Sequence, residues 1–293
     1  MMVMFEISWL FLTLAGAFCV AGARIFQKIV LSDKKSDAFV FSFFFQLLVA
    51  GVFLAYTQLT NTWEFPNLTM VWKNILLMTG LYALGNLFSF KAYKYAEASE
   101  ASILFSTGTI WSIVTALIFL DEKLSIYQLL GILIVIVGIV ITYFEKTGWK
   151  FNKGHIFALV SSLFYGVAFT NDVYIISKYQ SIASYMFIIF FLPSLATLAF
   201  RPRSLSKLGV YFSSFKKTLA VTSSVVLYSF SVIALFTAYK LGGQASIISP
   251  IFQTSMIFTV LFGYFFLKEK KRLWQKIVGI LFAFGGVLLI VSS

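Results

Sequence analysis

Two charged residues that lie inside long apolar runs are the best candidates for chemistry in this chain. Arg24 falls within the run 7–30, and Asp172 is the acid that falls clearly inside a run, 154–177. Ionisable groups within such segments are costly to bury, so they usually face a protein interior or a water-filled path. We expect Asp172 to titrate and to exchange its proton, or its pairing with Arg24, with a ligand. The structural alternatives are a fixed Arg24–Asp172 ion pair and an Arg24 side chain that snorkels to the surface.

Polar and aromatic residues in the same runs form a second set of candidates. Aromatic faces with a few convergent polar groups are typical of small-molecule sites. The residues predicted to line a central cavity are Arg24, Asn86, Trp111, Tyr165, Asn171, Tyr228 and Gln253. The chain has 35 Phe and 14 Tyr, so the alternative for each aromatic residue is contact with lipid or simple packing.

Enzymatic and metal-dependent chemistry has little support in the sequence. One cysteine and one histidine, His155, cannot form a disulfide framework or the usual zinc cluster. An intramembrane enzyme would normally need clustered acids, histidines or metal ligands. The chain also contains no Gly-x-x-x-x-Gly-Lys-Ser/Thr loop for nucleotide phosphates. We therefore predict no enzyme, no cofactor and no direct use of ATP, and we expect a surface role for His155.

The composition places the elements that position these residues in a membrane. Of 293 residues, 60% are hydrophobic and 12% are charged, against roughly 45–50% and about 25% in soluble domains. A helix that crosses a bilayer needs about 20 mostly apolar residues. The sequence therefore predicts an all-α integral membrane protein with ten transmembrane helices, at 7–30, 38–57, 72–93, 99–120, 126–144, 154–177, 182–200, 217–239, 245–267 and 273–291.

The positive charge is distributed unevenly between the two sets of loops. A net charge of +12 would point to nucleic acid in a soluble protein, but 18 of the 23 Lys and Arg residues lie at the loops after spans 1, 3, 5, 7 and 9. Short cytoplasmic loops retain positive charge. The count predicts no nucleic-acid partner, cytoplasmic odd-numbered loops and both termini outside, in what we expect to be a bacterial plasma membrane.

The chain repeats itself. A shift of 147 places Glu97-Ala98-Ser99 on Gln244-Ala245-Ser246, and Glu122-Lys123 on Glu269-Lys270. Shifts of 146 and 148 extend the match to Ala92-Tyr93-Lys94 and to Gly131 with Gly138. We predict two five-helix repeats, 1–146 and 147–293. Because five is odd, the second repeat is inverted, and inverted repeats recur in secondary transporters with a site at their interface.

Smaller features of the repeats carry their own expectations. Glu122 and Glu269 lie at helix corners, where capping and loop salt bridges are the expected roles. Gly131 and Gly138, like Gly279 and Gly286, are seven residues apart, so each pair shares a helix face that allows a neighbour close approach. Ser249-Pro250 either breaks the ninth helix and frees carbonyls toward the cavity, or Pro250 is a tolerated first-turn proline.

These duplicated stretches resemble the drug/metabolite transporter superfamily, in its ten-helix branch with paired EamA-like domains. The resemblance is carried by the Ala-Tyr-Lys ends of spans 3 and 8 and by the Leu-x-Glu-Lys corners, each followed by a Gln and two glycines. It implies a carrier of small organic metabolites, often an exporter, with a cavity lined by helices 1, 3, 4, 6, 8 and 9. It also implies cytoplasmic termini, against the charge count, and gate roles for Tyr93 and Tyr239, to which we add Pro250.

Together these features predict a secondary transporter or exchanger that works by alternating access. Its expected partners are the lipid bilayer, a small-molecule substrate and a coupling proton or exchanged solute, in a monomer or homodimer. The alternative is a flippase for an anionic lipid-linked intermediate, for which Lys91, Lys94 and Arg24 would suit the headgroup. A channel is disfavoured because inverted halves favour alternating access over a constant pore.

Overall fold

Helices make up almost the whole of the computed structural model, which describes residues 2–64, 67–119, 125–145, 148–149, 151–176, 181–241 and 251–291. Two antiparallel strands of two residues each lie between the two sets of helices, and Phe144 pairs there with Trp149. The elements are α1 (Met2–Ser32), α2 (Ala38–Leu59), α3 (Leu68–Tyr95), α4 (Ala98–Phe105), α5 (Thr107–Phe119), α6 (Ile126–Tyr143), β1 (Phe144–Glu145), β2 (Gly148–Trp149), α7 (Lys153–Ile176), α8 (Ile182–Phe200), η1 (Pro202–Phe212), α9 (Phe215–Lys240), α11 (Ser255–Leu267) and α12 (Leu273–Val291).

Seven of the described helices are long and apolar enough to cross a bilayer: α1, α2, α3, α6, α8, α9 and α12. Two of the long helices begin at side chains that cap them. The Asp37 carboxylate accepts from the backbone N–H of Phe39 in α2, and the Ser181 hydroxyl accepts from that of Ser184 in α8. Each of the ten predicted ranges is mainly helical where it is described. The all-helical membrane fold is confirmed, while the count of ten spans stays a prediction.

The predicted fourth and ninth spans are not continuous helices. The fourth consists of α4 and α5, which are separated at Ser106. Hydroxyls at the break donate back to the preceding turn, Ser106 to the carbonyl of Ile103 (2.6 Å) and Thr107 to that of Leu104 (2.7 Å). Side chains of this kind compete with the helical ladder and bend helices. In the ninth, turn residues 253 and 254 precede α11, and Ser249-Pro250 lies outside the described residues.

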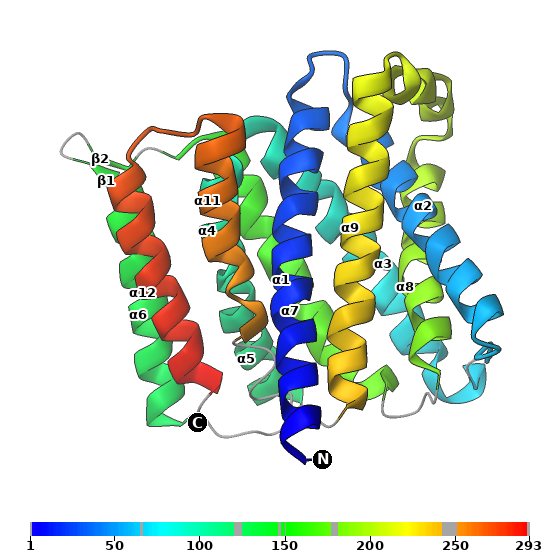
Figure 1. Cartoon of the computed structure of the whole chain (residues 1–293), viewed down its shortest axis with the longest axis horizontal. Helices are drawn as coiled ribbons and strands as arrows, with labels where there is room; N and C mark the ends of the chain where they lie inside the picture. Colours follow the sequence, from blue (N-terminus) through cyan, green and yellow to red (C-terminus); the bar gives the residue numbers. More distant parts are fainter. Residues whose placement is uncertain are drawn as a thin grey trace.

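The helices of the two repeats pack as exchanged pairs. α1 packs extensively on α9 and α3 on α7, while α2 packs on α8 and α6 on α12. In repeat order, α1, α2, α3 and α6 correspond to α7, α8, α9 and α12. If each helix is replaced by its counterpart in the other repeat, the same four contacts result. Figure 1 shows the N-terminus at one end of the molecule and the hairpin that leads into α7 at the other, so the two copies enter from opposite faces.

Glycines form the contact between α6 and α12, as the sequence predicts. A methyl group on Gly286 would lie 2.6 Å from the carbonyl oxygen of Gly131, and one on Gly138 would lie 2.6 Å from that of Gly279. Both contacts are with backbone atoms, so the helices touch where glycine leaves out a side chain. Gly131 and Gly138 of the first repeat correspond to Gly279 and Gly286 of the second, so these two contacts are equivalent under the symmetry of the repeats.

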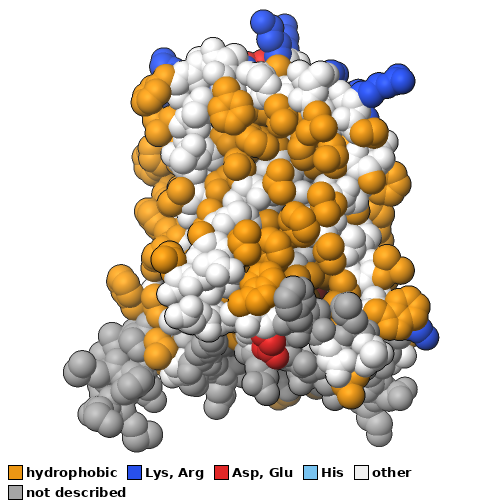
Figure 2. Space-filling view, turned by 90° about the vertical axis from the view of Figure 1, so that its right-hand side faces the viewer, with side chains coloured by type: hydrophobic (Ala, Val, Ile, Leu, Met, Phe, Trp, Pro, Cys, Tyr) orange, Lys and Arg blue, Asp and Glu red, His pale blue; other side chains and the backbone are white. Residues whose placement is uncertain are grey.

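The two ends of the bundle differ in charge. In Figure 2, hydrophobic side chains cover the height of one face, and Lys and Arg side chains gather at its top edge. This end, which we call the basic face, carries residues 33–37, the hairpin, η1 and residues 268–272, whereas both chain ends lie at the opposite face (Figure 1). The shared face of the termini agrees with the sequence analysis. Which face meets the cytoplasm stays a prediction.

Candidate functional site

A cavity of about 740 Å³ lies between the two repeats. Residues of α1, α2, α3, α4, α7, α8, α9 and α11 line it, together with Phe252 and Gln253 before α11. The cavity wall is mainly apolar. Its polar and charged residues are Arg24, Gln27, Tyr82, Asn86, Ser89, Tyr93, Ser102, Ser106, Tyr165, Asp172, Tyr185, Tyr228, Ser231 and Gln253.

Asp172 is held by two tyrosines from different helices. The hydroxyl of Tyr82 in α3 donates to Oδ2 of Asp172, and the hydroxyl of Tyr185 in α8 donates to Oδ1, each over 2.5 Å. Asp172 itself is 8% exposed. Hydrogen bonds to a carboxylate are stronger than those between neutral groups, so this pair fixes the side chain at the cavity wall.

Arg24 lies apart from Asp172. Its Nη1 donates to the hydroxyls of Ser255 (3.3 Å) and Thr259 (3.4 Å) in α11, and no carboxylate among the described residues forms an ion pair with it. The fixed Arg24–Asp172 pair is therefore wrong as an alternative. Snorkelling is wrong as well, because Arg24 lines the internal cavity.

A chain of hydrogen bonds supports the cavity wall between these two charges. The Tyr165 hydroxyl donates to Oδ1 of Asn86 over 2.8 Å, and the Asn86 amide donates to Oε1 of Gln46 (3.1 Å) and to the carbonyl of Tyr82 (2.9 Å). Gln46 donates in turn to the carbonyl of Ser42. The chain links α7 of the second repeat to α3 and α2 of the first, and it leaves Asn86 with few unused hydrogen-bonding groups.

The structure brings most of the predicted cavity residues together, but two lie elsewhere. Asn171 exchanges two hydrogen bonds with Asn74 of α3, of 2.7 and 2.9 Å, away from the cavity lining. Trp111 is 37% exposed and does not line the cavity; its Cβ lies close to Gly166 of α7. Both residues fall on helix faces other than the one the spacing suggested.

The three predicted gate residues have separate outcomes. Tyr93 lines the cavity near the basic face, and its ring meets that of Phe105 edge to face. Tyr239 lies in α9, with its side chain outside the described part of the chain. Pro250 lies outside the described residues altogether.

Sequence reasoning missed the residues that hold the two charges. Tyr82 is the repeat counterpart of Tyr228 at a shift of 146, so the internal alignment contained a signal for it. Tyr185 lies in α8 with no repeated tyrosine at the matching position. Ser255 and Thr259 are one helical turn apart, a spacing that places both hydroxyls on one face of α11.

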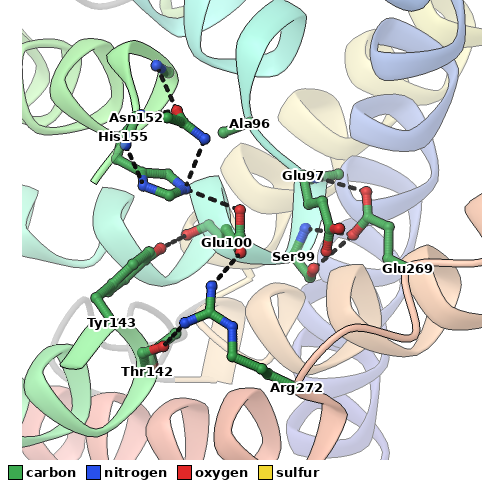
Figure 3. A network of polar contacts seen from close by, with 12 residues as sticks. Ala96, Glu97, Ser99, Glu100, Thr142, Tyr143, Asn152, His155, Glu269 and Arg272 are labelled. Atoms are coloured by element: carbon green, nitrogen blue, oxygen red, sulfur yellow. Dashed lines mark hydrogen bonds and ion pairs between the residues drawn. The ribbon is translucent and has the colours of Figure 1, made fainter. Parts of the chain in front are cut away.

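Glu269 joins the two repeats at the basic face. Its carboxylate accepts from the backbone N–H groups of Ala98 (2.7 Å) and Ser99 (3.0 Å), and from the Ser99 hydroxyl (2.5 Å). Figure 3 shows the carboxylate directed at the start of α4. The predicted capping role of Glu269 is confirmed, and the helix that it caps belongs to the other repeat. Glu122 lies outside the described residues.

A second acid, Glu100, extends this contact. Its carboxylate binds Nε2 of His155 (2.8 Å) and Nη2 of Arg272 (3.3 Å), both from the second repeat. His155 is 2% exposed, so the expected surface role was wrong; burial beside an acid follows from the packing of α7 on α4. Glu97 also pairs with Lys276 of α12. We call these residues the basic-face clasp, and Figure 3 labels all of them except Lys276: Glu97, Ser99, Glu100, His155, Glu269, Arg272 and Lys276.

Lys28 of α1 binds backbone carbonyls at the end of α3. Its ammonium donates to the carbonyls of Tyr93 (2.7 Å) and Ala96 (2.6 Å), where α3 ends. The two other lysines predicted to suit an anionic lipid headgroup, Lys91 and Lys94, also have partners within the protein. Lys94 donates to the carbonyl of Ser36, and Lys91 lies over the rings of Phe88 and Phe157. Neither Lys91 nor Lys94 reaches the cavity lining where Arg24 lies.

A strap formed by η1 covers the basic face above α2. The Tyr211 hydroxyl donates to the carbonyl of Asp37 over 2.8 Å, and Arg201 pairs with the Asp37 carboxylate over 3.1 Å. Burial raises the pKa of Tyr211. Nearby, the hydrogen bond from Lys217 lowers the pKa of the partly exposed Asp33. The strap ties the second repeat to the capping residue of α2.

A cavity between inverted repeats of apolar helices defines an integral, multi-pass membrane protein of the transporter class. The model of the EamA-like transporter family matches residues 7–144 and 152–292. The chain belongs to this family, whose members are transporters and not enzymes. The resemblance stated from the sequence is thereby confirmed.

Solved structures agree on the fold. One of 19 matching chains, titled "Crystal structure of protein", is 14% identical and aligns with a TM-score of 0.60, with 95% of each chain covered. At this identity the likeness concerns the fold alone. A search of curated proteins found no significant match.

Proposed function

We propose that the protein is a secondary active transporter that exports or exchanges a small organic solute by alternating access. The observation that carries this proposal is the 740 Å³ cavity at the interface of the two inverted repeats, with Arg24 and Asp172 in its wall. Inverted repeats provide two related packings, one open to each face. The solute would be released by rearranging the repeats around a fixed site.

In this mechanism the basic-face clasp is the closed gate of one state. Its ion pairs and the cap from Glu269 all join the start of α4 or the residues before it to the second repeat. Opening the cavity to the basic face would require these contacts to break. In this proposal Tyr93 moves with the clasp, because α3 ends at Tyr95, two residues before Glu97.

Asp172 is the coupling residue in this proposal. It is the acid among the described cavity-lining residues, and its carboxylate lies within hydrogen-bond reach of two hydroxyls. A proton taken up there would change the hydrogen bonding between α3, α7 and α8. Energy would then come from a proton gradient or from exchange, and transport would depend on pH.

The first test is a search for a ligand. Because a compound that binds only the folded protein raises its melting temperature, the detergent-purified protein is screened against amino acids, nucleotides, polyamines and lipid phosphates at two pH values. A soluble hit is then followed by counterflow in proteoliposomes. Stabilisation by lipid phosphates alone would replace the solute carrier by the flippase.

The coupling role is tested with Asp172→Asn in the same proteoliposomes. We expect the variant to retain folding, judged by a monodisperse elution profile, and to lose the pH dependence of transport. Asp33→Asn provides a matched control, because the same substitution neutralises a partly exposed acid outside the cavity. Unchanged pH dependence in Asp172→Asn would remove this residue from the coupling step.

A further inference from the structure

We propose that the cavity selects a singly charged organic anion, with the anionic group at Arg24 and an aromatic or apolar body against the phenylalanine side chains of the wall. This inference rests on the proposed function, because it takes the cavity as the substrate site. It adds the chemical class of the substrate.

The first argument is the unneutralised charge of Arg24. Among the described residues that line the cavity, Arg24 is the only Lys or Arg. Its two hydrogen bonds are long and end on neutral hydroxyls, and Thr259 already donates its own proton to the carbonyl of Ser255. A guanidinium has five N–H donors in a planar fork that matches a carboxylate. A buried charge is costly without a partner, so an anionic ligand would supply the negative charge that neutralises Arg24.

The second argument is that Asp172 does not offer an equivalent site for a cation. Each of its oxygens already accepts a hydrogen bond of 2.5 Å from a tyrosine. An ammonium group would have to share these oxygens with Tyr82 and Tyr185, which already stabilise the negative charge, whereas an anion at Arg24 has only two weak contacts to replace. The cavity therefore favours negative ligands over positive ones.

A single negative charge follows from the number of cations within reach. A dianion such as a phosphate ester would call for a second cation, and the nearest candidate on α1, Lys28, is bound to two carbonyls and does not line the cavity. One guanidinium matches one carboxylate or sulfonate. The site thus differs from a phosphate pocket.

The body of the ligand is indicated by the rest of the lining. Seven phenylalanines contribute to the wall, from α2, α3, α4, α7, α8, α9 and the turn before α11: Phe45, Phe90, Phe105, Phe169, Phe190, Phe236 and Phe252. Sites for small molecules are about 300–1,000 Å³ and mostly apolar, so the cavity suits a compound of one or two rings.

The test uses three probes that share one ring system and differ in charge: indole-3-acetate, indole-3-acetamide and tryptamine. Binding to the detergent-purified protein is measured by isothermal titration calorimetry near neutral pH. We expect the carboxylate to bind at least tenfold more tightly than the amide or the amine. Arg24→Gln should remove this preference, Arg24→Lys should keep part of it, and Arg203→Gln, on the exposed η1, should leave it intact.

Other outcomes overturn the proposal. Equal binding of the amide, tighter binding of tryptamine, or an unchanged carboxylate preference in Arg24→Gln would each reject the anion site, and tighter binding of phenyl phosphate than of phenylacetate would reject the single charge. Counterflow separates this failure from that of the proposed function. Carriage of tryptamine but not indole-3-acetate would keep the transporter and reject the anion.

Discussion

The carboxylate of Glu269 contacts both the backbone and the hydroxyl of Ser99, a residue 170 positions earlier in the chain, at 3.0 and 2.5 Å. A negative charge at a helix N-terminus satisfies free N–H groups and complements the helix dipole. The corner of one repeat thus holds the broken helix of the other. In the proposed mechanism, this contact forms only in the state whose basic face is closed.

The substitution Glu269→Gln should therefore favour opening at the basic face. It keeps the shape of the side chain and removes the charge from three hydrogen bonds, each worth roughly 1.5–3 kcal/mol when charged. In a Cys19→Ser background, a reporter cysteine at Ser102 in the cavity wall is alkylated by an impermeant maleimide added to the basic face. We expect alkylation to be several-fold faster than in the parent.

The control for this experiment is Lys271→Gln, which changes the charge of an exposed residue in the same loop. It should leave the alkylation rate unchanged. If Glu269→Gln also left the rate unchanged, the contact would be structural and not part of a gate.

Two adjacent glycines of α12 allow a controlled test of the contact between α6 and α12, because Gly286 lies at the contact and Gly285 does not. Gly286→Ala would place a methyl group 2.6 Å from the carbonyl of Gly131 and 2.8 Å from the backbone nitrogen of Val135. Forced overpacking costs about 1–3 kcal/mol, so we expect melting of the purified protein several degrees lower. Gly285→Ala enters open space and should be neutral or slightly stabilising; equal effects would show that the helices can separate freely.

Removing the hydroxyl of Tyr211 should loosen the strap over α2. Tyr211→Phe loses the hydrogen bond to the carbonyl of Asp37, at a cost of about 1 kcal/mol, and should lower the melting temperature. Burial raises the pKa of Tyr211 in the folded state, so its contribution is present below the unfolded pKa of about 10 and is lost as pH rises above it.

The difference in melting temperature between wild type and Tyr211→Phe should therefore shrink above about pH 10. Tyr127→Phe alters an exposed tyrosine of α6 and serves as the control across the same pH range. A difference that stayed constant with pH would contradict burial of the Tyr211 hydroxyl.

Asn171 should matter for stability rather than for ligand binding. Asn171→Ala removes the two hydrogen bonds between Asn171 and Asn74, and an intramolecular hydrogen bond contributes about 0.5–1.5 kcal/mol to stability. Melting should fall, while the affinity for indole-3-acetate, measured on the same preparation, stays within twofold. A large loss of affinity with normal melting would return Asn171 to the cavity.

Local chemistry was enough to predict several features from the sequence. Apolar length predicts spanning helices, and the odd number of spans per repeat predicts inversion. The spacing of Gly131 and Gly138 predicts a close helix contact, because a seven-residue step returns to the same helix face. Arg24 and Asp172 stand out because a charge within an apolar helix is costly unless it faces the protein interior or a water-filled path.

The partners of these residues were decided only by the tertiary structure. The sequence was equally compatible with an ion pair between Arg24 and Asp172. In the structure, Tyr82 and Tyr185 instead reach the acid from two other helices. Rotation of each helix about its axis, set by side-chain packing across the whole bundle, turns Trp111 away from the cavity. Contacts between residues distant in the chain depend on that packing, and no local pattern encodes them.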